Sequence, residues 1–141
     1  IPLDKNNKNL LILPNIKAIN MINELIYIKE TDVVYYDLDP LDANIKKIVN
    51  KSKYYENIIF GIYDTQFNKK QNELLNSIEN NNCILISLKS PYDVTYIQKD
   101  ISTYICCYEP TKLAINSLLK VIYGNEIAKG KLPVSLSGGK V

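Results

Sequence analysis

The sequence predicts an α/β protein, a three-layer α/β/α sandwich around a mostly parallel sheet of about five or six strands. Short apolar runs recur along the 141 residues, and helical patterns separate most of them. Most runs are continuous rather than alternating, which is typical of strands covered on both faces in a parallel sheet. The length fits one domain, and 46% hydrophobic residues are enough for a core.

Six apolar runs mark the expected strands. They cover residues 10–13, 33–38, 58–63, 83–88, 104–108 and 132–136. The last run follows Gly130, which permits a turn, and it contains Pro133, which has no backbone N–H and therefore suits an edge strand or a strand start.

Four helical patterns lie between these runs. Two of them place apolar residues at i, i+3, i+4 and i+7, the spacing of one helix face. The helix near the C-terminus has Pro110 and Thr111 at its start and Gly124 at its end, residues that favour those positions. Residues 90–100 are less regular. The apolar positions are Ala18, Met21, Ile22 and Leu25; Leu41, Ile45, Ile48 and Val49; Leu74, Leu75 and Ile78; and Ile115, Leu118, Leu119 and Ile122.

The whole chain, residues 1–141, is expected to form this single domain, with residues 1–9 as a connector and 137–141 as a tail. No apolar stretch approaches the ~18 residues of a membrane span, so we expect a soluble chain. The start Ile-Pro-Leu-Asp lacks the basic and apolar segments of a signal peptide. Its abruptness leads us to expect a longer parent protein, and the compartment, cytoplasm or cell envelope, stays open.

Composition excludes several classes of site. The 17 basic residues are all lysines, and there is no histidine. Ser-His and Cys-His nucleophiles and histidine metal sites therefore cannot form from this chain alone. Without arginine there is no bidentate guanidinium clamp on phosphate or guanine. A net charge of +2 gives no electrostatic footprint for nucleic acid, and we expect no metal, no cofactor and no nucleic-acid partner.

The three cysteines are Cys83, Cys106 and Cys107, and they form no CxxC pair. Neighbouring residues of a strand point to opposite faces, so Cys106 and Cys107 are poorly placed to bond each other. We expect buried free thiols.

Ligands of doubly wound sheets usually bind at the carboxyl ends of the strands, so a binding site is expected there. The first strand is followed by Pro14 and Asn15 without a glycine-rich phosphate loop, which argues against a nucleotide site. Asp37 and Asp39 follow the second strand and Asp64 the third. Aspartates at such positions usually cap free backbone amides of helices and turns.

The last third of the chain carries more specific motifs. CILISLKSPYDVTYI is an apolar strand followed by a Ser-Pro-Tyr-Asp loop, and STYICCYEPTKLAINSLLKVIYGNEIAKGKLPVSL contains a strand, a helix, Tyr-Gly and Gly-Lys-Leu-Pro-Val. Residues 83–136 resemble the C-terminal domain of family-three glycoside hydrolases, particularly the β-N-acetylhexosaminidase branch. In that family an Asn-Pro-Tyr-Asp type loop follows a strand, and a helix ending in Phe-Gly or Tyr-Gly precedes a Gly-Lys-Leu-Pro-Val closing strand. The opening IPLDKNNKNLLILP is similar to the family's Leu-Pro-Leu segment.

The resemblance implies that this sandwich follows a TIM-like barrel carrying the nucleophilic aspartate. In the hexosaminidase branch an Asp-His pair on a barrel loop is the acid/base, whereas many β-glucosidase relatives use a glutamate of the sandwich. This chain has no histidine, and none of its glutamates lies in a matching motif. We therefore expect no catalytic residue here: the isolated chain is inactive, and the parent is a β-N-acetylhexosaminidase or β-glucosidase type enzyme. Its expected partner is the N-terminal barrel of the same protein, and an amino-sugar glycan stays open as a second.

The candidate binding residues are Ser90, Tyr92 and Asp93 in the Ser-Pro-Tyr-Asp loop, together with Asp64. Ser90 replaces the family's usual asparagine, and Pro91 and Asp93 are expected to form a rigid turn and a helix cap.

Two other interpretations stay open. A stand-alone small-ligand or regulatory module would place its site where the Pro14, Asp37 and Asp64 loops converge. An autonomous hydrolase would use Asp64 or another carboxylate.

Overall fold

The computed structural model describes residues 8–16, 31–79, 82–97, 99, 101, 103–107, 112–122 and 135–136. Six strands form one sheet in the order β2-β1-β3-β4-β5-β6. β1 to β5 are parallel, and β6 pairs with β5 in the antiparallel sense. This confirms the predicted α/β class and the mostly parallel sheet. The strands are β1 Asn9–Pro14, β2 Thr31–Tyr36, β3 Asn57–Ile62, β4 Cys83–Ser87, β5 Thr103–Cys106 and β6 Ser135–Leu136.

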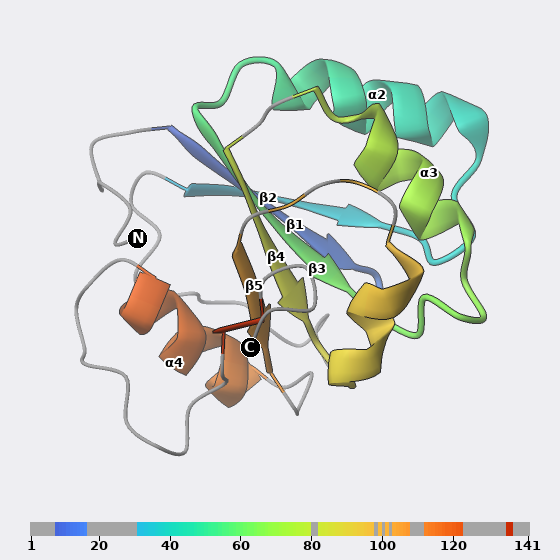
Figure 1. Ribbon diagram of the computed structural model, residues 1–141. Helices are drawn as coiled ribbons and strands as arrows, with labels where there is room; N and C mark the ends of the chain where they lie inside the picture. The colour runs from blue at the N-terminus through green and yellow to red at the C-terminus, as the bar shows by residue number, and fades with distance from the viewer. Residues whose placement is uncertain are drawn as a thin grey trace.

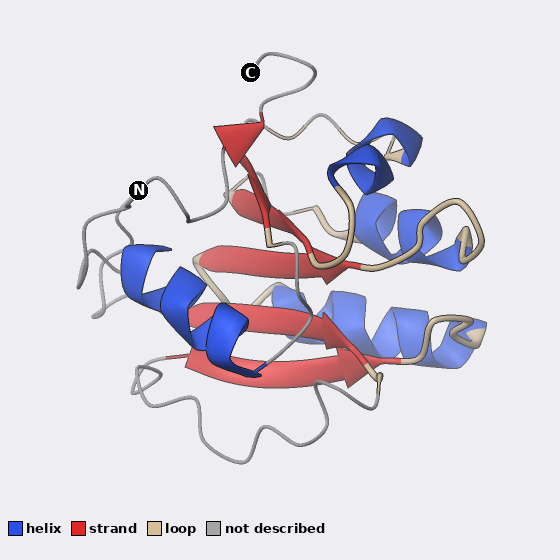
Figure 2. Ribbon diagram, turned by 90° about the horizontal axis from the view of Figure 1, so that it is seen from below, coloured by secondary structure: helices blue, strands red, loops and turns tan. Residues whose placement is uncertain are grey.

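Helices cover both faces of the sheet (Figures 1 and 2). α2 (Asp42–Ser52), α3 (Lys70–Ser77) and the 3₁₀ helix η1 (Pro91–Tyr96) pack on one face, and α4 (Lys112–Ile122) packs on the other. The three predicted layers are therefore present.

Two hydrophobic cores lie on either side of the sheet because successive strand residues point to opposite faces. In β1, Leu10 and Ile12 join the core under α2 and α3, whereas Leu11 and Leu13 join the core under α4. All residues of β1, β3 and β4 are buried, which explains why their sequences are continuous apolar runs.

The apolar face predicted for the helix after β5 is confirmed. Ile115, Leu118, Leu119 and Ile122 of α4 are all buried. The predicted helix at 18–25 lies outside the described residues, as do residues 132–134 of the closing strand; the described part of that strand, β6, forms an edge of the sheet beside β5.

One helix assignment was wrong at its first residue. Ile45 and Ile48 of α2 are buried as predicted, but Leu41 precedes the helix and exposes 69% of its surface. The spacing of the apolar residues starts the helix one residue too early, because the backbone at Leu41 is still extended and α2 begins at Asp42.

The three cysteines are buried free thiols, as predicted. Burial raises the pKa of Cys83 to about 12, and the positive charge of Lys99 opposes this rise by a smaller amount. β1 begins at Asn9, the last residue of the predicted connector. None of the described helices is long and apolar enough to cross a membrane.

Candidate functional site

The parallel strands β1 to β4 end at one edge of the sheet, called here the carboxyl edge (Figure 2). β1 lies between β2 and β3, so the chain direction across the sheet reverses between β1 and β3. In open α/β sheets this switch point is the usual place for a ligand. The loops after these strands are therefore the part of the described chain where a ligand is most expected.

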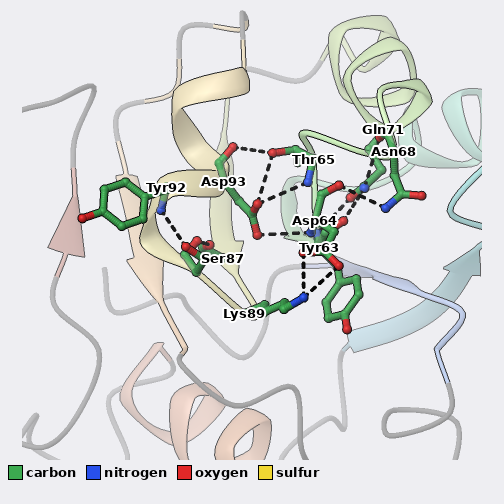
Figure 3. Close-up of polar contacts among 10 residues, drawn as sticks. Tyr63, Asp64, Thr65, Asn68, Gln71, Ser87, Lys89, Tyr92 and Asp93 are labelled. Atoms are coloured by element: carbon green, nitrogen blue, oxygen red, sulfur yellow. Dashed lines mark hydrogen bonds and ion pairs between the residues drawn. The ribbon is translucent and has the colours of Figure 1, made fainter.

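An ion pair joins the loops after β3 and β4 (Figure 3). The Lys89 Nζ lies 3.0 Å from both carboxylate oxygens of Asp64, and 5.3 Å from the centre of the Tyr63 ring. The hydrogen bond to Asp64 is the main reason that the pKa of Lys89 is raised. Asp64 has a φ of 50°, a left-handed conformation that aspartate tolerates better than most residues. Lys89 therefore neutralises the charge of the Asp64 carboxylate.

Asp93 joins η1 to the loop after β3. Its carboxylate accepts hydrogen bonds from the backbone N–H groups of Asp64 and Thr65, each at 3.2 Å, and the Thr65 hydroxyl donates to the Asp93 carbonyl at 2.7 Å. The prediction that Asp93 caps its own helix is therefore wrong, because the carboxylate serves a loop 28 residues away. Burial raises the pKa of Asp93, although the two N–H donors oppose the rise.

A buried glutamine fixes α3 to the end of β3. The Gln71 Oε1 accepts from the Tyr63 N–H at 2.9 Å and from the Tyr36 hydroxyl at 2.8 Å, and Nε2 donates to the carbonyls of Tyr63 and Asn68. Gln71 and Tyr36 are almost completely buried. This contact sets the direction in which the chain leaves the strand and so positions Asp64.

The loops after β1 and β2 form a separate polar pair. The Asn15 amide donates to the Asp37 carboxylate at 3.0 Å, and the Asn15 N–H donates to the Tyr36 carbonyl at 2.7 Å. The structure therefore places the predicted Pro14, Asp37 and Asp64 loops on the same edge, but Asp37 and Asp64 belong to different pairs.

Ser90 and Tyr92 have different surroundings from the two aspartates. The Ser90 hydroxyl oxygen accepts from the Tyr92 N–H at 3.2 Å and so caps η1, whose start includes Pro91 as the predicted turn. The Tyr92 ring exposes 75% of its surface and points away from Asp64 and Asp93 (Figure 3).

Two hollows adjoin these loops. The first, of about 490 Å³, lies between α3 and η1, and the second, of about 360 Å³, lies beside β2 and α2. The first is lined by Thr65, Lys69, Asn72, Thr95 and Tyr96.

The described carboxyl edge offers little chemistry of its own. Asp64 is paired with Lys89, and both oxygens of Asp93 already accept hydrogen bonds. In this arrangement the oxygens of both carboxylates are directed at protein groups, Asp64 at Lys89 and Asp93 at backbone N–H groups. Within the described part of the chain, no three or more acidic or cysteine side chains are grouped to hold a metal ion.

Sequence reasoning missed Lys89, Thr65 and Gln71. Lys89 stands directly before the Ser-Pro-Tyr-Asp loop and could have been noticed as a partner for an acid on the neighbouring strand. Gln71 carries no such signal, because a polar residue in a weakly amphipathic helix is normally expected to face water.

Acidification is expected to raise the stability of the wild-type protein relative to that of an Asp93→Asn variant. The pKa of Asp93 is higher in the folded chain than its ordinary value, so its proton is bound more tightly in the folded state. This contribution to stability therefore rises as the pH falls from above the folded pKa toward about 4. Urea unfolding of both proteins between pH 4 and 7 measures it. A wild type that loses stability relative to Asp93→Asn on acidification would contradict the assignment.

The chain is similar to known proteins in its structure but not detectably in its sequence. The sequence matches no protein-family model and no curated protein. Among solved structures, a family-three glycoside hydrolase β-N-acetylglucosaminidase from Paenibacillus sp. str. FPU-7 is similar with a TM-score of 0.76 and 20% identity. A fungal multi-domain β-N-acetylglucosaminidase of the same family, which has a GCN5-related glucosamine N-acetyltransferase region, is similar with a TM-score of 0.72 and 18% identity.

Both matches cover nearly all of this chain but a small part of the other protein. The shares are 93% of this chain and 28% of the Paenibacillus chain, and 98% and 16% for the fungal enzyme. The chain thus spans less than a third of either enzyme. It has the fold of one part of family-three β-N-acetylglucosaminidases, the fold that the motifs at 83–136 led us to expect.

Proposed function

We propose that this chain is the non-catalytic C-terminal domain of a β-N-acetylhexosaminidase-like family-three glycoside hydrolase. Its role is to support a catalytic barrel of the same polypeptide. The observation that carries the proposal is the partial match: almost the whole chain superposes on a minor part of two enzymes of one kind. The motifs at residues 83–136 support the same assignment independently of the superposition.

The occupied carboxylates support a non-catalytic role. Asp64, the residue named for an autonomous hydrolase, forms a two-oxygen contact with Lys89. Asp93 is buried and serves the backbone of the loop after β3. Neither resembles a carboxyl pair on facing sides of a sugar cleft, which glycoside hydrolysis requires.

The finer part of the proposal is that the carboxyl edge borders the sugar cleft. The candidate binding residues Ser90, Tyr92, Asp93 and Asp64 belong to the loops at this edge, and of these four we propose that Tyr92 contacts an amino-sugar glycan. Among them the exposed Tyr92 ring offers a surface on which a sugar could stack, while Asp93 acts by holding its loop.

Hydrolysis of a chromogenic β-N-acetylglucosaminide tests the proposal. We expect activity from the full-length product of the gene and none from the 141-residue chain. Asp64→Asn in the full-length product is expected to keep activity within about threefold of wild type, as for a residue outside the reacting groups. Turnover by the short chain, abolished by Asp64→Asn, would instead support the autonomous hydrolase.

A stand-alone small-ligand module is the second candidate, and the strand order favours it. The reversal between β1 and β3 lies where such sheets usually bind ligands. Thermal unfolding with a panel of sugars, nucleotides and metabolites tests this function. Stabilisation by one of them, lost in Asp37→Ala, would support it, and no stabilisation by any would count against it.

A further inference from the structure

Polar side chains line most of the hollow of about 490 Å³ between α3 and η1, called here the α3–η1 hollow. Thr65, Lys69 and Asn72 come from the loop after β3 and from α3, and Thr95 and Tyr96 belong to η1. The volume lies within the range of small-molecule sites, about 300 to 1,000 Å³. The polar lining favours a polar occupant over an apolar one.

The side chain of Asn72 has an unmet hydrogen-bond acceptor. Its Oδ1 is buried and accepts no hydrogen bond, and it is the only such side-chain nitrogen or oxygen within the described part of the chain. An unpaired buried carbonyl oxygen costs stability, so a folded protein that keeps one usually has a partner for it, such as a water molecule or a ligand. Because Asn72 borders the α3–η1 hollow, a molecule bound there can supply the missing donor.

Two threonine hydroxyls of the same hollow can only accept further hydrogen bonds. The Thr65 hydroxyl donates to the Asp93 carbonyl at 2.7 Å, and the Thr95 hydroxyl donates to the Tyr92 carbonyl at 2.6 Å. A hydroxyl has one proton, so its remaining capacity is the lone pairs of its oxygen. Together with Asn72 Oδ1 these oxygens make three acceptors, which suit an occupant with several O–H donors.

The charge at the hollow favours an anion. Lys69 is the only charged residue among the described residues that line it, and none of the described acids lies within ion-pair distance of its ammonium group. A lysine ammonium attracts phosphate or carboxylate as a point charge. It would repel a second ammonium on the ligand, so neutral hydroxyls are the donors that fit the three acceptors.

The two walls of the hollow are joined before anything binds (Figure 3). The Asp93 carboxylate in η1 accepts from the N–H groups of Asp64 and Thr65, and the Thr65 hydroxyl returns a hydrogen bond to the Asp93 carbonyl. A site that is already formed loses less entropy when it binds a ligand. The Tyr96 ring, 42% exposed, offers an apolar surface for the carbon skeleton of that ligand.

We propose that the α3–η1 hollow binds a small polyhydroxylated anion, a sugar phosphate or a sugar acid. Its hydroxyls donate to Asn72 Oδ1 and to the two threonine oxygens, and its phosphate or carboxylate pairs with Lys69. The site includes neither Tyr92, proposed above to contact a glycan, nor Asp37 of the small-ligand module. The inference therefore goes beyond the proposed function and does not rest on it.

Isothermal titration calorimetry of the native gene product, at the length at which the cell makes it, tests the proposal. The probes are gluconate and glucose 6-phosphate, which combine hydroxyls with a carboxylate or a phosphate. Glucose lacks the anion and inorganic phosphate lacks the polyol, so these two are the controls. We expect at least one anionic polyol to bind about tenfold or more tightly than both controls. Binding of gluconate alone would identify a carboxylate ligand, and binding of glucose 6-phosphate alone a phosphate ligand; either result supports the inference.

Two variants locate the binding in the hollow. Asn72→Ala and Lys69→Gln are each expected to weaken it by about tenfold or more, because each removes one of the ligand's polar partners. The matched controls are Asn76→Ala on the exposed side of α3 and Lys53→Gln directly after α2, which should change the affinity by less than about twofold. Asn72→Ala should also unfold at the same or a higher urea concentration than wild type, because it removes an unpaired buried oxygen.

Three results would overturn the inference. Failure of both anionic polyols to bind would mean that water alone fills the hollow. Affinity unchanged in Asn72→Ala and Lys69→Gln would place the ligand elsewhere, and a clear loss of stability in Asn72→Ala would mean that Oδ1 already has a structural partner. All three would leave the proposed function intact, because that function is tested by hydrolysis of the glucosaminide.

Discussion

Replacing Gly61 by valine is expected to destabilise the chain by about 3 kcal/mol, because it overfills the core under α4. Gly61 lies in the buried strand β3. A Cβ atom there would stand 3.0 Å from Leu13 Cδ2 and 3.0 Å from Leu88 Cδ1, and both leucines are completely buried. The neighbouring strands β1 and β4 leave these side chains little room to move. Urea unfolding with an unchanged m-value measures the loss.

A double-mutant cycle gives the control for the Gly61 prediction. Leu88→Ala removes the Leu88 Cδ1 and Cγ atoms, which a Cβ would meet at 3.0 and 3.4 Å, so Gly61→Ala should cost less in that background than in wild type. Ile59→Val, on the same face of β3, should cost only about 1 kcal/mol. A Gly61→Val protein as stable as wild type would show that the packing around β3 is looser than described.

Replacing Gln71 by alanine is expected to cost about 3 kcal/mol, because it removes the partner of the buried Tyr36 hydroxyl and of several partly buried backbone groups. The side chain satisfies the N–H and the carbonyl of Tyr63, and it also receives the Tyr36 hydroxyl. Leaving such groups unpaired away from water costs more than a hydrogen bond normally contributes. Chemical denaturation of the variant measures the change.

Two variants show whether the Gln71 effect comes from these hydrogen bonds. Tyr36→Phe removes one hydroxyl that reaches both Gln71 and the Gly61 carbonyl, and it should cost about 1 kcal/mol. Asn76→Ala on the exposed side of α3 should change stability by no more than about 0.5 kcal/mol. A Gln71→Ala effect as small as that of Asn76→Ala would contradict the role assigned to Gln71.

The strands could be predicted because strands that are buried on both faces consist mostly of apolar residues. β1, β3 and β4 are covered on both faces, so every position after the first residues of β1 and β3, Asn9 and Asn57, is apolar or small, and the runs stand out. The helix α4 could be predicted because its four buried residues keep one spacing. Leu41 was misassigned because spacing alone cannot tell the first turn of a helix from the residue before it.

The polar contacts at the carboxyl edge could not be predicted in the same way. Asp93 and Thr65 are joined across 28 residues, and only the packing of η1 beside the loop after β3 brings them together. Gln71 is buried because its hydrogen bonds are satisfied, which is a property of the folded chain rather than of its local sequence. Asp64 is a candidate from the sequence, and the pairing of β3 with β4 is what identifies Lys89, rather than another lysine, as its partner.

The proposal that this chain is one domain of a longer glycosidase is tested most directly by the mass of the native polypeptide. An antibody raised against the 141-residue chain, used to blot extracts of cells that express the gene, gives that mass. A band of about 45 to 60 kDa is predicted, because a barrel of roughly 250 to 400 residues would accompany the sandwich. A single band near 16.1 kDa, the mass of this chain alone, would contradict the central claim and favour the small-ligand module.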